Sequence, residues 1–236
     1  LKDSSMCGVI GLIQASIADA PQKALKALKV MEYRGYDSWG VAWGEFQSDA
    51  NLSHAVVYRK VGQIGKAKLP VQAVSKQALG HTRWATHGGV TIANAHPHLS
   101  ADQRFALVHN GVLENFRTLK AQLLSEGYVF RSETDTEVIL AIWERSFSKL
   151  SHECKCATTL ELLELTARHC FAELKGSNAI VVMDYASGFG VAVRSGSPLI
   201  VGKSSEGYCV VSDMLALVGL ADVYVTLGDK QLAVFN

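Results

Sequence analysis

Residues 6–11 are MCGVIG, so a cysteine directly follows a methionine and begins an apolar run. One interpretation is a buried cysteine in a first β-strand. The other is that Met6 is the true start of the working protein and that its loss exposes Cys7 as the first residue. The thiol and the α-amine of such a residue have pKa values of about 8.5 and 8, and they form a nucleophile and a base without a partner from elsewhere. Under that interpretation, residues 1–6 are a leader, either an expression remnant or a propeptide.

The overall composition excludes several classes of protein. The 236 residues suit one large domain, and an apolar content of 48% is enough for a substantial core. The formal net charge of +1 argues against nucleic acid as a partner. No apolar run approaches the roughly 20 residues that cross a bilayer, and the five irregularly spaced cysteines do not form a disulfide pattern. We therefore expect a cytoplasmic protein that does not bind membranes.

Short runs of β-branched and aromatic residues dominate both ends of the chain. They predict strands over 7–13, 38–46, 54–61, 105–109, 179–185, 190–195, 198–202, 208–212, 222–227 and 232–235. The spacing of apolar residues predicts helices over 21–33, 116–123, 135–148, 160–174 and 213–220. Paired helices between two groups of strands predict an α+β fold with largely antiparallel sheets. Strands that are apolar nearly throughout indicate sheets enclosed between helix layers.

The remaining cysteines have structural interpretations or metal-binding ones. Cys170 lies on the apolar stripe of the helix 160–174, so we expect it to pack in the core. Cys154 and Cys156 form a C-x-C motif near His152, in a polar stretch (149–158) that we predict to be a surface loop or insertion. A tetrahedral zinc at this motif would need ligands from elsewhere in the chain.

Four stretches carry more polar chemistry than a core needs. They are YRGYDSWG (33–40), GHTRWATHGG (80–89), NAHPH (94–98) with VHNG (108–111), and SETDTE (132–137). Polar residues beside glycines, after apolar strands, are typical of functional loops on a rigid scaffold. Each stretch on its own also has a plain structural explanation.

For the first two stretches the alternatives concern charge. Arg34 and Asp37 could form a surface ion pair. Arg83, at the end of a predicted strand, is either structural or grips a carboxylate with two parallel hydrogen bonds. His81 and His87 could bind a metal, although no carboxylate or thiol accompanies them at a familiar spacing.

For the last two stretches the alternatives concern backbone geometry. His96 and His98 flank a proline, in a rigid turn that shapes a loop. Asn110 and Gly111 form either a turn or a pair of donors, one side-chain amide and one backbone N–H, for a developing oxyanion. Asp135 begins a predicted helix, so it either caps that helix or holds a substrate ammonium group.

Together these stretches resemble the glutaminase domain of class II glutamine amidotransferases, which are N-terminal nucleophile hydrolases. CGVIG, EYRGYDS, HTRWATHG, NAHPH, VHNG and SETDTEV follow the order found in that family, and the later RSGSPL (194–199) and SD (212–213) also fit. The resemblance covers 7–236 and is strongest to the glutamine–fructose-6-phosphate aminotransferases (isomerising). The purine-pathway branch is the weaker alternative. Trp39 departs from the family, which usually has a small residue there.

The resemblance implies a four-layer αββα sandwich and a reaction that needs no metal or cofactor. Cys7 would attack L-glutamine and form a γ-glutamyl thioester, while Asn110 and Gly111 hold the oxyanion. The residues implied in substrate binding are Arg83, Trp84, Thr86, His87 and Asp135, with Arg34 and His109 in support.

The resemblance also has implications for the remainder of the enzyme. The sugar isomerase domains, which bind fructose 6-phosphate and receive the ammonia for glucosamine 6-phosphate synthesis, are absent from 7–236. We therefore expect a fragment of a longer, homo-oligomeric synthase that hydrolyses glutamine but makes no amino sugar alone. While residues 1–6 are attached, Cys7 has an amide in place of an amine. A glutamine-binding module without activity is thus the alternative function.

Overall fold

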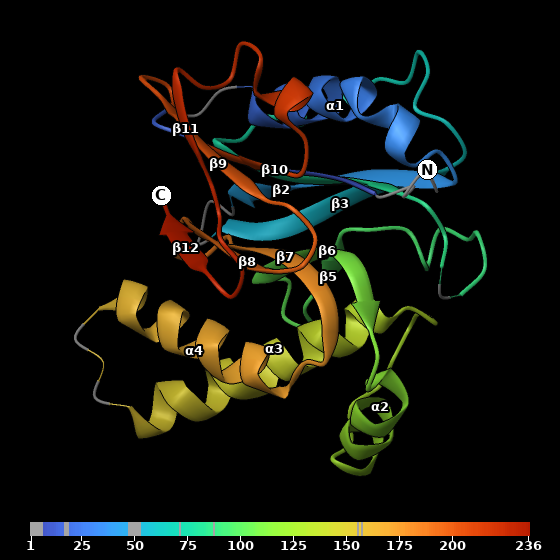
Figure 1. Ribbon diagram of the computed structural model, residues 1–236, viewed down its shortest axis with the longest axis vertical. Helices are drawn as coiled ribbons and strands as arrows, with labels where there is room; N and C mark the ends of the chain where they lie inside the picture. Colours follow the sequence, from blue (N-terminus) through green and yellow to red (C-terminus); the bar gives the residue numbers. More distant parts are fainter. Residues whose placement is uncertain are drawn as a thin grey trace.

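The structure is a computed structural model that describes residues 7–16, 19–46, 53–70, 72–86, 88–154, 156 and 158–236. Two β-sheets lie face to face, and helices cover both outer faces (Figure 1). Helix α1 (Ala20–Val30) lies on one outer face, and α3 (Asp135–Glu153) and α4 (Thr159–Glu173) lie on the other. Helix α2 (Phe116–Ser125) packs beside α3. This arrangement confirms the predicted α+β fold in four αββα layers.

The first sheet has seven strands and contains the stretch that begins at Cys7. Their spatial order is β11 (Val223–Thr226), β9 (Ile200–Ser204), β10 (Gly207–Val211), β1 (Gly8–Gln14), β4 (Gln77–Arg83), β2 (Ser38–Phe46) and β3 (Ser53–Val61). All neighbouring pairs are antiparallel. Because β1 is the central strand, Cys7 lies in the middle of the sheet, at the end where β1 begins and where its neighbours β4 and β10 finish.

The second sheet has five strands in the order β12 (Leu232–Phe235), β8 (Phe189–Ser195), β7 (Gly176–Asp184), β6 (Phe105–Leu113) and β5 (His98–Leu99). Strand β6 pairs with β7 from Phe105 opposite Asp184 to Leu113 opposite Gly176. The strand predicted at 105–109 therefore continues through Asn110 and Gly111, and the interpretation of these two residues as a turn is wrong.

Three apolar layers explain why so many strands are apolar on both faces. Along β1, Val9 faces the layer between the two sheets, whereas Ile10 faces the layer under α1, as alternation along a strand requires. The third layer lies between the five-stranded sheet and helices α2–α4, and it contains Cys170, as predicted. Trp39 is only 1% exposed and packs against Tyr58, with ring centroids 5.8 Å apart.

Several element boundaries differ from the predictions. Residues 149–153 form the last turns of α3 and not a loop, since the helix continues until the backbone becomes extended at Cys154. The helix predicted over 213–220 is a short 3-10 helix, η2 (Met214–Leu217). Strand β4 was predicted only through its end at Arg83, without a range. Strand β5 was not predicted, because two residues beside a proline carry no strand pattern. Among the described helices, none is long and apolar enough to span a membrane.

Candidate active site

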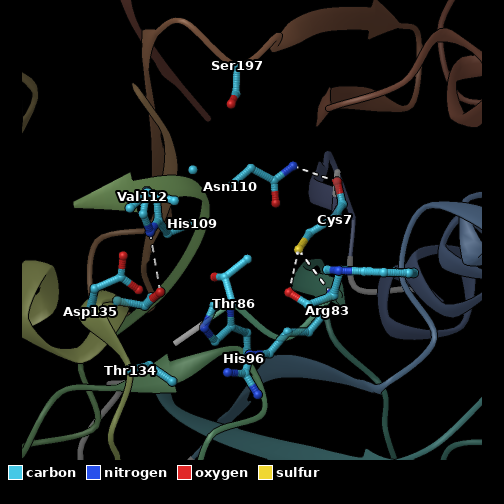
Figure 2. A pocket seen from close by; sticks show the side chains of 13 residues that line it. Cys7, Arg83, Thr86, His96, His109, Asn110, Val112, Thr134, Asp135 and Ser197 are labelled. Carbon is cyan, nitrogen blue, oxygen red and sulfur yellow. Dashed lines mark hydrogen bonds between the residues drawn. The ribbon is translucent and has the colours of Figure 1, made fainter. Parts of the chain in front are cut away.

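A cavity of about 200 Å³ lies at the edge where β1 begins, between the two sheets (Figure 2). Most residues that the sequence singled out line it: Cys7, Arg83, Trp84, Thr86, His109, Asn110, Gly111 and Asp135. Arg34 does not line the cavity, and His87 lies outside the described residues. These residues come from four separate stretches of the chain and meet at one place.

The sulfur of Cys7 is held by the loop that follows β4. The Trp84 backbone N–H donates to Cys7 Sγ at 3.1 Å, and the Trp84 carbonyl oxygen lies 3.7 Å from the same sulfur. Burial raises the pKa of the Cys7 thiol, while the Trp84 N–H and the Arg83 and Arg34 guanidinium groups act in the opposite direction. The site therefore combines a desolvated thiol with nearby groups that favour its thiolate.

Two neighbouring strands fix the backbone around Cys7. Thr82 Oγ1 on β4 accepts from the Gly8 N–H at 2.9 Å. Ser212 Oγ, just after β10, accepts from the Val9 N–H at 2.9 Å and lies 3.4 Å from the Cys7 carbonyl oxygen. A Cβ at Gly8 would lie 2.6 Å from Thr82 Oγ1, so only glycine allows this close approach. Local sequence pattern gave Thr82 no role, because its partner is 74 residues away.

Asn110 and Gly111 approach Cys7 from the other sheet. Asn110 Nδ2 donates to the Cys7 carbonyl oxygen at 2.6 Å, so the amide reaches directly across the cavity (Figure 2). Gly111 has a φ of 134°, and a Cβ there would lie 1.8 Å from the Ser177 carbonyl oxygen. Only glycine can occupy this position in the ladder of β6 and β7. The backbone geometry at this point is therefore fixed by the sheet.

Arg83 and Asp135 bring opposite charges to the cavity. Arg83 Nη1 donates to the Gly89 carbonyl oxygen at 3.2 Å, and burial lowers the pKa of its guanidinium. Asp135 Oδ2 accepts from the Leu113 N–H at 2.9 Å. The N-cap of α3 is Thr134, whose side chain accepts from the Glu137 N–H, so the interpretation of Asp135 as the cap is wrong. Its carboxylate instead joins α3 to β6.

The ion pair considered between Arg34 and Asp37 does not form. Arg34 Nη1 pairs with Asp213 Oδ2 at 2.6 Å, whereas Asp37 Oδ2 accepts from the Ala85 N–H at 2.9 Å. The two charges separate because each finds a partner that is distant in sequence but adjacent in the fold. Asp37 thereby holds the same loop that carries the Trp84 N–H.

Three buried histidines, His81, His96 and His98, form a cluster at the cavity, and His96 is one of the residues that line it. The rings of His81 and His96 have centroids 4.3 Å apart, and those of His96 and His98 are 4.9 Å apart. Burial lowers the pKa of His81 and of His98 to about 3, and that of His96 also falls well below its ordinary value. The histidines are neutral at pH 7. His96 and His98, predicted to shape a loop through a rigid turn, both belong to this buried cluster.

The metal interpretations find no support among the described residues. Within that part of the chain, no group of three or more His, Cys, Asp or Glu side chains is arranged to hold a metal ion. This applies to His81 and to the motif formed by Cys154 and Cys156. All five cysteines are described, and all are free thiols.

Four lining residues had no individual role predicted from the sequence. They are Val112, Thr134, Thr136 and Ser197. Thr136 Oγ1 lies 3.4 Å from His109 Nδ1, and Thr134 Oγ1 lies 2.9 Å from His98 Nε2. Both threonines lie in the SETDTE stretch, so its composition indicated their region but not their partners.

Comparison with known proteins gives a match to a protein family and matches to individual proteins. A family described as a glutamine amidotransferase domain matches residues 56–156. The glutamine–fructose-6-phosphate aminotransferase (isomerizing) of Bacillus thuringiensis subsp. konkukian is 39% identical over 97% of this chain. The chain spans 36% of the length of that relative.

Two solved structures are similar in fold. One, the allosteric regulatory enzyme of purine biosynthesis, gives a TM-score of 0.77 at 25% identity, over 97% of this chain and 46% of the other. The second is the glutamine phosphoribosylpyrophosphate amidotransferase from B. subtilis, complexed with ADP and GMP. It gives a TM-score of 0.72 at 23% identity, over 97% of this chain and 48% of the other.

The αββα sandwich is the fold of the N-terminal nucleophile class. The chain belongs to the glutamine amidotransferases of this class. Within them it is homologous to the glutamine–fructose-6-phosphate aminotransferases, of which it spans about a third. The family resemblance predicted from the order of the motifs is confirmed.

Proposed function

We propose that this domain hydrolyses L-glutamine to glutamate and ammonia. The observation that carries the proposal is the meeting of Cys7, Asn110, Gly111, Arg83 and Asp135 at one cavity of about 200 Å³. Glutamine has a reactive side-chain amide at one end and an α-carboxylate and α-ammonium at the other. The thiol and the two oxyanion donors complement the side-chain amide. The guanidinium complements the α-carboxylate, and the carboxylate complements the α-ammonium.

In the proposed reaction, Cys7 Sγ attacks the side-chain carbonyl carbon of glutamine. The thiol proton passes to the α-amine of Cys7, in a chain that begins at this residue. The carbonyl electron pair moves to oxygen, where Asn110 Nδ2 and the Gly111 N–H stabilise it by about 3–4 kcal/mol per donor. When the carbonyl re-forms, the C–N bond breaks and the amine returns its proton to the leaving ammonia. Water then hydrolyses the γ-glutamyl thioester to glutamate and restores the thiol.

Substrate binding follows from the charges around the cavity. Arg83 binds the α-carboxylate with two parallel hydrogen bonds, and Asp135 binds the α-ammonium. Thr86 lines the site, His87 is assigned to the same site by the family resemblance alone, and Trp84 belongs to the loop that closes over glutamine. Two further residues support the site, Arg34 through its charge near Cys7 and His109 through its contact with Thr136.

The remaining proposals concern the context of the domain. Residues 1–6 are a leader, and 7–236 form the amidotransferase domain. The ammonia serves a sugar isomerase domain of the same homo-oligomeric enzyme, which makes glucosamine 6-phosphate from fructose 6-phosphate. The name of the Bacillus relative, glutamine–fructose-6-phosphate aminotransferase, and its greater length support this assignment. The five free thiols support the cytoplasm, where thiols stay reduced.

The test uses the chain cut so that it begins at Cys7. We expect it to release glutamate from glutamine and to bind one equivalent of a diazoketone analogue of glutamine on Cys7, as measured by intact mass. Cys7→Ala abolishes both, lowering the rate by at least about 10⁴-fold, because no other group replaces the nucleophile. Cys170→Ala is the matched control, since that thiol is buried in the core. A cut chain that neither hydrolyses glutamine nor reacts with the analogue would contradict the proposal.

A further inference from the structure

The Asn110 amide lies between two partners that fix which way it points. Its Nδ2 donates to the Cys7 carbonyl oxygen at 2.6 Å, and its Oδ1 lies 3.1 Å from His81 Nε2. A carboxamide can stabilise an oxyanion only if its NH₂ group faces the reacting atoms, because its oxygen is an acceptor. The group that binds Asn110 Oδ1 therefore determines whether the NH₂ group can stabilise an oxyanion.

The surroundings of His81 determine which of its ring nitrogens carries the hydrogen. Nε2 lies 3.2 Å from the His109 carbonyl oxygen as well as 3.1 Å from Asn110 Oδ1. A backbone carbonyl oxygen accepts and never donates, so Nε2 must be the donor and Nδ1 the unprotonated nitrogen. If the Asn110 amide were flipped, its NH₂ would face the His81 N–H, and two donors would oppose each other.

The position of the His81 side chain is fixed by the strands and the ring that surround it. It lies on β4 between Val9 of β1 and Gly40 of β2, and its side chain is 0% exposed. The ring packs against His96, whose Nδ1 lies 3.4 Å from His81 Nε2. Burial lowers the pKa of His81 to about 3, so the ring stays neutral at pH 7 and keeps this single tautomer.

We propose that His81 is a positioning residue that orients the Asn110 amide with its NH₂ group toward Cys7. This role rests on the proposed glutaminase function, because the oriented amide matters for the rate only if an oxyanion forms. The oxyanion exists in the transition state and not in bound glutamine. Loss of the orientation therefore lowers kcat and leaves KM nearly unchanged.

The kinetic test uses the chain that begins at Cys7. We expect His81→Leu to lower kcat about 30-fold with KM changed less than about threefold, since one oxyanion donor loses its alignment. His81→Gln, which can place an amide N–H near the position of Nε2, should restore kcat to within about fivefold of the original. In an Asn110→Ala background, His81→Leu should cost less than about twofold, because the group that it orients is gone.

A matched control separates positioning from general loss of packing. His98→Leu removes another buried histidine of the same cluster, whose ring nitrogen contacts Thr134 and not Asn110. We expect it to lower stability by a similar amount while kcat stays within about twofold. Equal losses of kcat in His81→Leu and His98→Leu would overturn the positioning role.

A second measurement does not depend on catalysis. The ¹⁵N chemical shifts of His81 should show a hydrogen on Nε2, and the Asn110 NH₂ protons should exchange slowly with solvent and faster in His81→Leu. A hydrogen on Nδ1, or a His81→Leu effect of the same size in the Asn110→Ala background, would overturn the inference even if glutamine is hydrolysed. An inert chain with the expected tautomer and protected amide would support the orientation and contradict the proposed function instead.

Discussion

The two walls of the cavity come from different sheets and are held by different means. The wall that carries the proposed nucleophile, called the nucleophile wall, consists of Cys7, Arg83, Trp84 and Thr86, at the ends of β1 and β4 and in the loop beyond. Figure 2 shows Cys7, Arg83 and Thr86 of this wall. The oxyanion wall consists of His109, Asn110 and Gly111 inside β6, with Asp135 in the first turn of α3. Asn110 is 2% exposed and Asp135 is 5% exposed, whereas Trp84 is half-buried and Thr86 is exposed.

This difference indicates that the two walls have different roles, one in stabilising the transition state and the other in aligning the thiol. Strand register and a helix N-terminus fix the oxyanion wall before any substrate arrives, and preorganised donors are what stabilises a transition state most. The outer part of the nucleophile wall depends on a few hydrogen bonds between loops, such as that from the Ala85 N–H to Asp37. Changes in the oxyanion wall should therefore affect kcat, and changes in the loop should affect the alignment of the thiol.

The largest expected effect beyond loss of the thiol is on the oxyanion wall. Asn110→Ala should lower kcat by about 10²–10³-fold, equivalent to about 3–4 kcal/mol, because one of the two oxyanion donors is lost. Steady-state kinetics on the chain that begins at Cys7 measures this, and KM should change by less than about threefold. Asn110→Asp is the matched control, since it keeps the size but loses the NH₂ donor and should be equally slow. A large rise in KM with unchanged kcat would mean that Asn110 only binds substrate.

The next effect is on stability, through the neutral histidines behind this wall. His81 and His98 have pKa values of about 3 in the folded protein and about 6.5 when unfolded. The unfolded chain therefore binds protons first as the pH falls. The stabilisation is complete above pH 6.5 and is lost progressively between pH 6.5 and 3, by up to about 1.4 kcal/mol per histidine for each pH unit.

Urea denaturation at pH 7.5 and at pH 5 checks this expectation. The free energy of unfolding should be lower at pH 5 by up to about 2 kcal/mol per histidine. In His81→Gln the difference should shrink, because one titrating ring is removed. Identical midpoints at the two pH values would show that the histidines do not stay neutral in the folded protein.

The smallest effect concerns the loop of the nucleophile wall. Asp37→Ala leaves the Ala85 N–H without its carboxylate acceptor, at a cost of about 1 kcal/mol. The adjacent Trp84 N–H then aligns less well with Cys7 Sγ, so the pKa of the thiol rises further. We expect kcat/KM to fall about fivefold at pH 7 and its pH profile to move to higher pH.

Asp37→Asn is the control for this loop, because its Oδ1 keeps an acceptor for the Ala85 N–H. It should retain most of the activity lost in Asp37→Ala. An unchanged pH profile in Asp37→Ala would show that the loop does not align the thiol, and the contrast between the two walls would then disappear.

Much of the fold was predictable because β-strands carry their own signal. Apolar and β-branched runs identified β1, β2, β3 and the strands after α4, with small errors at their ends. The prediction ended β6 too early, at His109, because Asn110 and Gly111 have the composition of a turn. The strand continues because β7 pairs with it beyond that point. Only a glycine at position 111 can adopt the required positive φ so close to Ser177.

The sequence by itself determined the layers, the family and most of the cavity's residues, because apolar periodicity and motif order are local properties. Only the tertiary structure decided the partners. It paired Arg34 with Asp213 and not with Asp37. It also placed the Asp135 carboxylate where it accepts from the N–H of Leu113 on β6, and it placed His81 beside Asn110. These contacts join residues between 22 and 179 positions apart. Their formation depends on which strands become neighbours, and no local pattern records that order.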